Sequence, residues 1–451
     1  MTTKERVYAY KDEIIASLAK LVKYNSVEGT PTETEPFGPV CAAVLKEALQ
    51  MMEEHGLKTT NLDNYIGFGE IGEGDKLVGI LGHLDIVPAG EGWNTDPFTV
   101  TEKDGKLYGR GTSDDKGAMV ASMYALQILQ DEGYKFNKRV RLITGTNEET
   151  GSRCLAHYVE KEGNFDYGFT PDANFPGVYG EKGMVSARFY CNDSRIISMN
   201  GGEASNVVCN KCTTLLPDDF CDFDKVEQYL KKENLEYTLK DTEEGKELVV
   251  RGVAAHASTP HLGRNAISYT FQALAFAGSD DPLVTKYNAL IGLATDGSNC
   301  NVKYEDKYGA LTFNNGVIKT TEEGIYGTID IRTGLLVKSE EIAERMQKAF
   351  DTCGLTLEVR GLVAPLFYEP ETPWVQAMVK AYRDVTGDME TQPMTIGGGT
   401  YAKGIGNCIG FGCEFVGDDN HIHDANEFVK ISDLLLQVEI YVETIKNLCE
   451  L

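Results

Sequence analysis

The stretch Val78-Gly79-Ile80-Leu81-Gly82-His83-Leu84-Asp85 decides the fold of the region around it. Its apolar run predicts a buried strand, as is typical of parallel sheets. Side chains alternate along a strand, so His83 and Asp85 face one side while Leu84 faces the other. An imidazole beside a carboxylate suits a metal ligand whose partner fixes its tautomer. His-X-Asp also occurs by chance on strand edges, so the rest of the chain has to decide between these interpretations.

Helices alternate with short apolar strands from Phe37 to about Asp172. Strands are expected at 77–84 and 140–144, with a helix at about 116–131 between them. This alternation predicts an α/β fold with a mixed, largely parallel sheet flanked by helices.

The pattern changes from about Gly183 to a mixture of alternating strands and helices. Two segments, 213–238 and 327–359, each suggest strand, turn, charged helix and strand, which predicts a duplicated α+β unit. We therefore expect a discontinuous first domain, 1–183 and 366–451, with a second α+β domain, 184–365, inserted into it. The other elements expected in the insert are strands at 249–255, 308–318 and 325–332 and helices at 224–234, 265–277 and 339–353.

Length, charge and cysteine content limit the class of protein. The chain has 451 residues, which is too long for one hydrophobic core. Its formal net charge of -26 disfavours nucleic acid and anionic membranes as partners, so a small substrate is expected. The first twenty residues predict an amphipathic helix rather than a signal sequence, and no run reaches membrane-spanning length. Eleven cysteines, an odd number, favour a reducing compartment and a cytoplasmic location. The pair Cys209 and Cys212 has no second pair to complete a zinc site.

Acids and histidines follow the predicted strands at several places far apart in the chain. In open α/β sheets the carboxyl ends of the strands meet in one crevice, so these loops are expected to converge. Their charges would repel one another without a cation, and two divalent ions would neutralise them. The segments are Gly109–Gly117, Thr146–Glu149, Thr170–Asp172 and His421–Glu427.

Mixed imidazole and carboxylate ligands suit zinc, with manganese as the alternative, better than calcium. Asp114 is the candidate carboxylate shared by both ions. His83 and Asp172 are the candidate ligands of one ion, and Glu149 and His423 those of the other.

Glu148 and Glu149 are neighbours in an extended segment, so they face opposite ways. One can hold metal while the other, Glu148, stands free as a general base. Each residue also has an ordinary explanation; Asp114-Asp115, for example, could simply cap the following helix. His421 competes with His423 and is interpreted as a surface imidazole, and His55 and His157 are interpreted as structural.

Several motifs together resemble the two-metal peptidase family that includes aminoacylase, carnosinase and glutamate carboxypeptidase, and within it bacterial dipeptidases of the PepV and Sapep type. The resemblance covers nearly the whole chain and implies a di-zinc catalytic domain with an inserted lid. It implies the same ligand set and base, Asp85 as the residue that orients His83, and a cis peptide bond between Asp114 and Asp115. The motifs are H-L-D-I-V-P-A-G-E-G-W from His83, G-R-G-T-S-D-D-K-G from Gly109, N-E-E-T-G-S from Asn147, G-F-T-P-D from Gly168 and H-D-A-N-E from His423.

The resemblance extends to residues that would contact the substrate. Gly252–Ser258 is similar to the family segment whose histidine, here His256, stabilises an oxyanion. Asn206 is similar to a lid asparagine near the substrate, and Arg332 to the arginine that binds a substrate carboxylate. Gly398 and Gly399 would let the backbone approach the substrate closely.

These residues imply a metal-dependent dipeptidase that attacks the peptide carbonyl with a metal-bridging hydroxide, with Glu148 as the general base. Lid closure would bring His256 and Arg332 to the metals and exclude long peptides. An N-acyl amino acid deacylase is the alternative enzyme, and the length of the insert favours the dipeptidase. A non-catalytic binding protein is a third hypothesis, disfavoured by the complete ligand set. Relatives with a duplicated lid are often monomers, so a monomer is expected.

Overall fold

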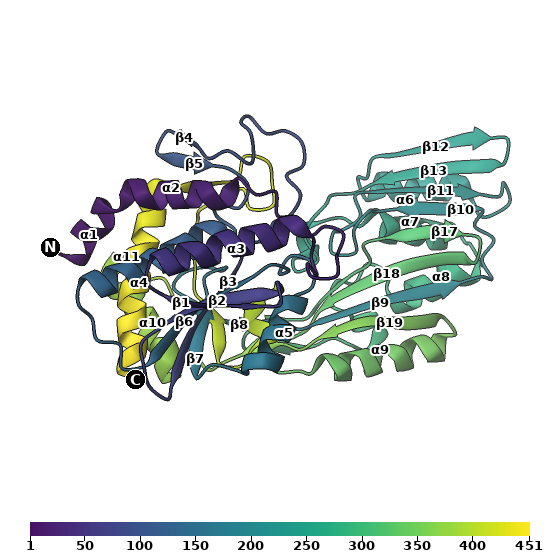
Figure 1. The fold of residues 1–451 in the computed structure, drawn as a ribbon. Coiled ribbons are helices and arrows are strands. Elements are labelled where there is room, and N and C mark those ends of the chain that lie inside the picture. Colours follow the sequence, from purple (N-terminus) through teal and green to yellow (C-terminus); the bar gives the residue numbers. More distant parts are fainter. The chain divides into compact units, whose positions relative to one another are not determined.

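The computed structural model describes residues 1–451, and the chain divides into two compact units. The first unit comprises Met1–Gly180 and Tyr368–Leu451, and the second comprises Glu181–Phe367. Figure 1 shows the mixed α/β character of the first unit and the broad sheet of the second. That these units correspond to a catalytic domain and an inserted lid stays a prediction, which limited proteolysis can test.

The sheet of the first unit has a parallel centre and antiparallel edges, as the sequence predicts. Strand β3 (Leu77–His83) runs parallel to β6 (Arg139–Gly145) and to β7 (Tyr167–Thr170), and β7 is parallel to β22 (Cys408–Gly410). All seven residues of β3 are buried, which explains its unbroken apolar run. The order is β1-β2-β6-β3-β7-β22-β8, with β1 (Lys58–Leu62), β2 (Ile66–Ile71) and β8 (Val178–Glu181), and with β21 (Met394–Ile396) paired to β8.

Helix α4 (Lys116–Asp131) is the central helix of the first unit. It contacts β3 and lies beside α11 (Ile431–Glu450), and 13 of its 16 residues are buried. Its first residue directly follows Asp115, so the core packing of α4 anchors the loop that carries the predicted bridging aspartate. The remaining helices are α3 (Pro39–Glu54), α5 (Arg153–Glu162), α10 (Pro373–Thr386) and the 3-10 turn η3 (Tyr401–Gly404).

The amino-terminal segment forms two helices where the sequence predicts one. Helices α1 (Thr3–Ala9) and α2 (Lys11–Val22) are separated at Tyr10. A small sheet, β4 (Thr101–Lys103), β5 (Lys106–Tyr108) and β23 (Phe428–Lys430), brings the segment after His423 next to the segment before Gly109. None of the helices combines the length and apolar character needed to cross a membrane.

The second unit contains one large sheet whose two halves share a strand pattern. In one half β13 lies between β11 and β12, and α6 joins β11 to β12; in the other, β9 lies between β18 and β19, and α9 joins β18 to β19. Each central strand is antiparallel to both neighbours. This pattern supports the duplication, which stays a prediction. The bounds are β9 (Met184–Cys191), β11 (Lys211–Leu216), α6 (Phe223–Lys232), β12 (Tyr237–Thr242), β13 (Gly245–Arg251), β18 (Gly324–Arg332), α9 (Ser339–Cys353) and β19 (Thr356–Val363).

Two strands predicted in this unit differ from the expectation: 308–318 is divided, and 249–255 is shifted to Gly245–Arg251. The expected strand 308–318 is divided among β15, β16 and β17. At the break between β16 and β17 the buried Asn315 donates to the carbonyl oxygens of Val317 (3.0 Å) and Thr328 (2.6 Å). Strand β13 ends at Arg251. The next residue, Gly252, packs against the carbonyl of Arg264, where an added Cβ would lie 1.8 Å from the oxygen. The other elements are β10 (Ser198–Gly201), η1 (Pro260–Leu262), α7 (Ala266–Phe276), α8 (Pro282–Leu290), η2 (Ser298–Cys300), β14 (Glu305–Asp306), β15 (Gly309–Ala310), β16 (Thr312–Asn314), β17 (Ile318–Thr321) and β20 (Leu366–Phe367).

Candidate metal centre

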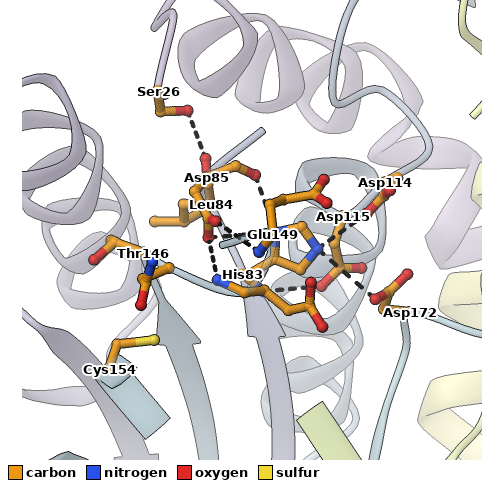
Figure 2. A network of polar contacts seen from close by, with 12 residues as sticks. Ser26, His83, Leu84, Asp85, Asp114, Asp115, Thr146, Glu149, Cys154 and Asp172 are labelled. Carbon is orange, nitrogen blue, oxygen red and sulfur yellow. Dashed lines mark hydrogen bonds and ion pairs between the residues drawn. The ribbon is translucent and has the colours of Figure 1, made fainter. Parts of the chain in front are cut away.

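Five predicted ligands from separate parts of the sequence lie together in the first unit. Each comes from the end of a strand or the start of another element. His83 is the last residue of β3, Asp114 precedes α4, Glu149 follows β6, Asp172 follows β7 and His423 precedes β23. Parallel strands bring these loops to one edge of the sheet, as Figure 2 shows for all but His423.

Asp114 stands between two imidazole–carboxylate pairs. Its Oδ1 lies 3.0 Å from Nε2 of His83, and the same nitrogen is 3.8 Å from Oδ2 of Asp172. Its Oδ2 lies 3.0 Å from Nε2 of His423, which is 3.3 Å from Oε2 of Glu149. Each oxygen of one carboxylate therefore faces its own imidazole and its own second acid.

Glu148 also approaches this cluster. The ligand atoms of His83, Glu148 and Asp172 lie within 4.8 Å of one another, as do those of His83, Asp114 and Glu149. The arrangement therefore does not by itself separate the two neighbouring glutamates into ligand and base.

The charges of the cluster shift the pKa values of its members strongly. Hydrogen bonds to Asp114 and Glu149 raise the pKa of His423 to about 10. Burial opposes ionisation of Asp114, but hydrogen bonds from both imidazoles hold its pKa well below the usual range. Burial and the neighbouring acids raise the pKa of Glu148 to about 8 and that of Asp172 well above its usual value. The site thus concentrates more negative charge than its own imidazoles neutralise.

The donor set fits divalent cations. The ring of His83 is buried, and Nδ1 donates to the carbonyl oxygen of Asp85 (3.0 Å), so Nε2 is left to face carboxylate oxygens alone. A ring nitrogen in that position calls for either a proton or a cation. Imidazole nitrogens mixed with carboxylate oxygens are the donors that zinc and manganese accept.

Asp85 has a different set of contacts from the expected one. Its carboxylate is 3.5 Å from the His83 ring, whereas its backbone carbonyl makes the closer contact. The carboxylate oxygens instead accept the backbone N–H groups of Glu148 (3.0 Å) and Glu149 (3.1 Å). Asp85 therefore orients the ring through its main chain and the two glutamates through its side chain.

The predicted substrate residues of the second unit form two local arrangements. The backbone N–H of Ser258 donates to Nδ1 of His256 (3.2 Å), which leaves the proton of a neutral ring on Nε2. Burial lowers the pKa of His256 and so favours that neutral form. Asn206 lies beside this segment, because its carbonyl accepts the N–H of Ala257 at 2.8 Å.

Arg332 is held by a neighbouring carboxylate. Its Nε and Nη2 donate to the two oxygens of Asp330 at 2.8 and 3.2 Å, a planar fork that fixes the guanidinium.

The glycine-rich segment 397–399 is followed closely by Tyr401, whose ring lies beside that of His83. Lys403 Nζ donates to the carbonyl of Gly398 (3.1 Å), and an added Cβ on Gly399 would lie 2.8 Å from that nitrogen. Tyr401 is buried, its ring lies 6.0 Å from the His83 ring, and its hydroxyl lies 2.8 Å from Sγ of Cys154.

Several residues at the site have no role in the sequence prediction. Ser26 Oγ donates to the carbonyl of Leu84 (2.6 Å), and Glu28 accepts from Asn147 Nδ2 (2.9 Å). Asp115 Oδ2 accepts the N–H of His83 at 3.0 Å. Ser26 and Glu28 belong to no recognisable motif. Asp115 could have been selected from the sequence, because it directly follows the predicted ligand Asp114.

Two further predictions concern the Asp114–Asp115 peptide bond and the role of His421. The Asp114–Asp115 peptide bond is cis, as predicted. The ring of His421 lies 5.9 Å from that of Phe428, whereas Nε2 of His423 lies 3.0 Å from Oδ2 of Asp114.

The chain is similar to known peptidases along nearly its whole length. The sequence pattern of Peptidase family M20/M25/M40 matches residues 79–447. A protein of Staphylococcus haemolyticus that carries the provisional name of a dipeptidase is 32% identical, over 99% of each chain. Human carnosine dipeptidase 1 superposes with a TM-score of 0.62 at 16% identity, covering 100% of this chain and 98% of the other. An M20 family metallo-carboxypeptidase of Sulfolobus solfataricus superposes with a TM-score of 0.60 at 20% identity, over 97% and 100%.

An α/β unit with imidazoles and carboxylates gathered at the carboxyl ends of parallel strands is an arrangement typical of metal-dependent hydrolases. Within that class, the match over most of its length shows that the chain belongs to peptidase family M20/M25/M40. It is a peptidase of that family.

Proposed function

We propose that this peptidase is a dipeptidase that uses two divalent metal ions. The observation that carries the proposal is the placement of Asp114, whose two oxygens each face a separate imidazole–carboxylate pair. The names of two similar proteins, a dipeptidase and a carnosine dipeptidase, support the choice of short peptides as substrates.

Asp114 would be shared by both ions, with His83 and Asp172 completing one site and Glu149 and His423 the other. When bound, such ions polarise a carbonyl and lower the pKa of a coordinated water. The buried carboxylates around Asp114 would supply the negative charge that binds two cations.

Glu148 is proposed as the general base. Its carboxyl is partly buried, and burial together with the nearby acids raises its pKa to about 8, which suits a group that takes up and releases a proton near neutral pH. Asp85 holds the backbone of Glu148 at 3.0 Å, which limits how far the carboxyl can move. In this position it can take a proton from the attacking water and return it to the leaving amine.

The second unit is proposed to act as the lid that completes the site. Neutral His256, with its proton on Nε2, is suited to donate to the developing oxyanion. Arg332, already oriented by Asp330, is suited to bind the substrate carboxylate, and Asn206 to contact the substrate beside His256. Gly398 and Gly399 would admit the substrate backbone closely.

Zinc is the proposed metal and manganese the alternative, because both accept mixed nitrogen and oxygen donors. We further propose a cytoplasmic monomer, on the strength of the cysteine content and the repeated strand pattern of the second unit.

The test is an assay of the purified protein with a panel of dipeptides, tripeptides and N-acetyl amino acids, before and after treatment with a chelator. Dipeptide cleavage that stops on chelation and returns with zinc or manganese supports the proposal. Faster cleavage of N-acetyl amino acids would make the protein a deacylase, and cleavage that survives chelation would reject the metal mechanism.

A further inference from the structure

Glu427 is a buried carboxylate turned toward the loop that carries Asp114. It is only 1% exposed. Its Oε1 accepts the N–H groups of Ser113 (2.9 Å) and Asp114 (3.1 Å), and the N–H of Gly111 lies 3.1 Å from each oxygen. Three of the five amides that precede α4, at residues 111–115, are thus bound to one side chain.

Arg110 compensates the charge of Glu427. Its Nη1 donates to Oε2 at 2.6 Å, and the guanidinium is itself 1% exposed and lies 5.4 Å from the ring centroid of Trp93. Burying a carboxylate is costly unless it is paired and hydrogen-bonded, and both conditions are met here. Both carboxylate oxygens of Glu427 are occupied by backbone N–H groups and by Arg110, so the side chain is placed to hold the loop rather than a metal.

The segment that contains Glu427 also carries His423 and is tied to the same loop at its other end. Asn420 Nδ2 donates to Oγ of Ser113 (3.3 Å), and the N–H of Gly109 donates to the Glu427 carbonyl (3.0 Å). His423 thus stands on a segment whose two ends contact the loop that ends in Asp114.

The neighbouring Asn426 extends these ties to another loop. Its Oδ1 accepts the N–H of Asn94 (2.8 Å), and its Nδ2 donates to the carbonyl of Gly92 (3.1 Å).

We propose that Glu427 is a positioning residue, which holds Asp114 and His423 at the separation that two-metal binding requires. The inference rests on the proposed function, since it assigns these two residues to the metal centre. The amide of Asp114 is bound directly by Glu427, so the backbone cannot turn and swing the Asp114 carboxylate away. Without the Glu427 side chain, the Asn420–Ser113 side-chain contact and the Gly109–Glu427 backbone contact would still join the two segments, but the 3.0 Å distance from His423 to Asp114 would be held less firmly.

The experiment compares the full-length wild type with Glu427→Gln and Glu427→Asp. Glutamine keeps an oxygen for the amides but loses the charge, and aspartate keeps the charge but is one methylene shorter. Zinc affinity is measured by competition with a chromophoric chelator, alongside bound zinc per chain, kcat and KM for a cleaved dipeptide, and thermal stability. Loss of a residue that orients ligands weakens metal affinity about 10- to 100-fold, and kcat should fall similarly while KM changes little.

The matched control is Glu162→Gln, which removes an ion pair with Arg141 (2.8 Å) at the base of β6 in the same unit. It should lower thermal stability without changing zinc affinity, which separates positioning from general stabilisation. A folded Glu427→Gln or Glu427→Asp protein with wild-type zinc affinity and kcat would overturn the inference. A wild type that binds no zinc or manganese would instead reject the proposed function.

Discussion

The two units hold their polar residues in different ways. In the first unit, the ligands follow buried parallel strands and support one another; His83 is fully buried and Asp114 is 6% exposed. In the second unit, His256 and Asn206 are exposed. The His256 ring accepts the N–H of Ser258, and the carbonyl of Asn206 accepts the N–H of Ala257. The first unit therefore gathers its acids and imidazoles into one cluster, whereas the predicted substrate residues of the second unit include exposed side chains.

The largest effect should come from Asp114→Ala. Because both imidazole–carboxylate pairs share Asp114, both ions should be lost and turnover should fall below detection. Bound metal per chain and kcat measure this. Asp424→Asn, an exposed acid in the same region, is the control and should retain both metals. A variant that loses only one ion would mean that the two pairs are more independent than their geometry indicates.

Glu148→Gln should lower kcat by about 10²- to 10⁴-fold, the contribution of a general base, while bound metal stays at the wild-type level. Steady-state kinetics and metal analysis on the same preparation check it. Loss of metal in this variant, with metal retained in Glu149→Gln, would exchange the roles of the two glutamates.

His256→Ala should lower kcat by about 10²- to 10³-fold, as expected for removal of one oxyanion donor, and should leave metal content and thermal stability unchanged. This variant tests the contrast directly, because the second unit would contribute to catalysis but not to metal binding. An altered metal content in this variant would show that His256 also affects metal binding, which the proposed mechanism does not include.

The smallest effect concerns the stability of chelated protein as a function of pH. The pKa of His423 is raised to about 10, so its contribution is fully present below about pH 6.5 and is lost as pH rises through 10. The raised pKa of Glu148, about 8, adds a loss of stability between about pH 4.5 and 8. Melting temperatures of the chelated protein should therefore fall from pH 6 to 10. The wild type with zinc should gain more stability from metal at pH 8 than at pH 6, because metal binding displaces protons. In His423→Gln the fall above pH 8 should disappear.

Much of the fold could be predicted because the elements have strong local patterns. The apolar run of β3 and the helix at 116–131 agree closely with the structure. The break at Asn315 was not predictable, because the contact of this side chain with a backbone carbonyl on another strand leaves no local pattern.

The candidate site likewise contains residues that the sequence could predict and residues that it could not. The motifs single out His83, Asp114, Glu149, Asp172 and His423, and the structure brings them together. The contacts of Ser26 and Glu28 gave no local signal, since neither residue belongs to a pattern that chemistry alone would select.

The sequence by itself determined the kind of chemistry, because the types and spacing of acids and histidines after strands restrict it to metal ligands and a base. Only the tertiary structure decided how those residues are held. Asp85 binds the amides of two glutamates more than 60 residues away, and Glu427 binds the amide of Asp114 from 313 residues away. Such hydrogen bonds leave no periodic trace in a sequence, because they depend on which loops the packed sheet places side by side.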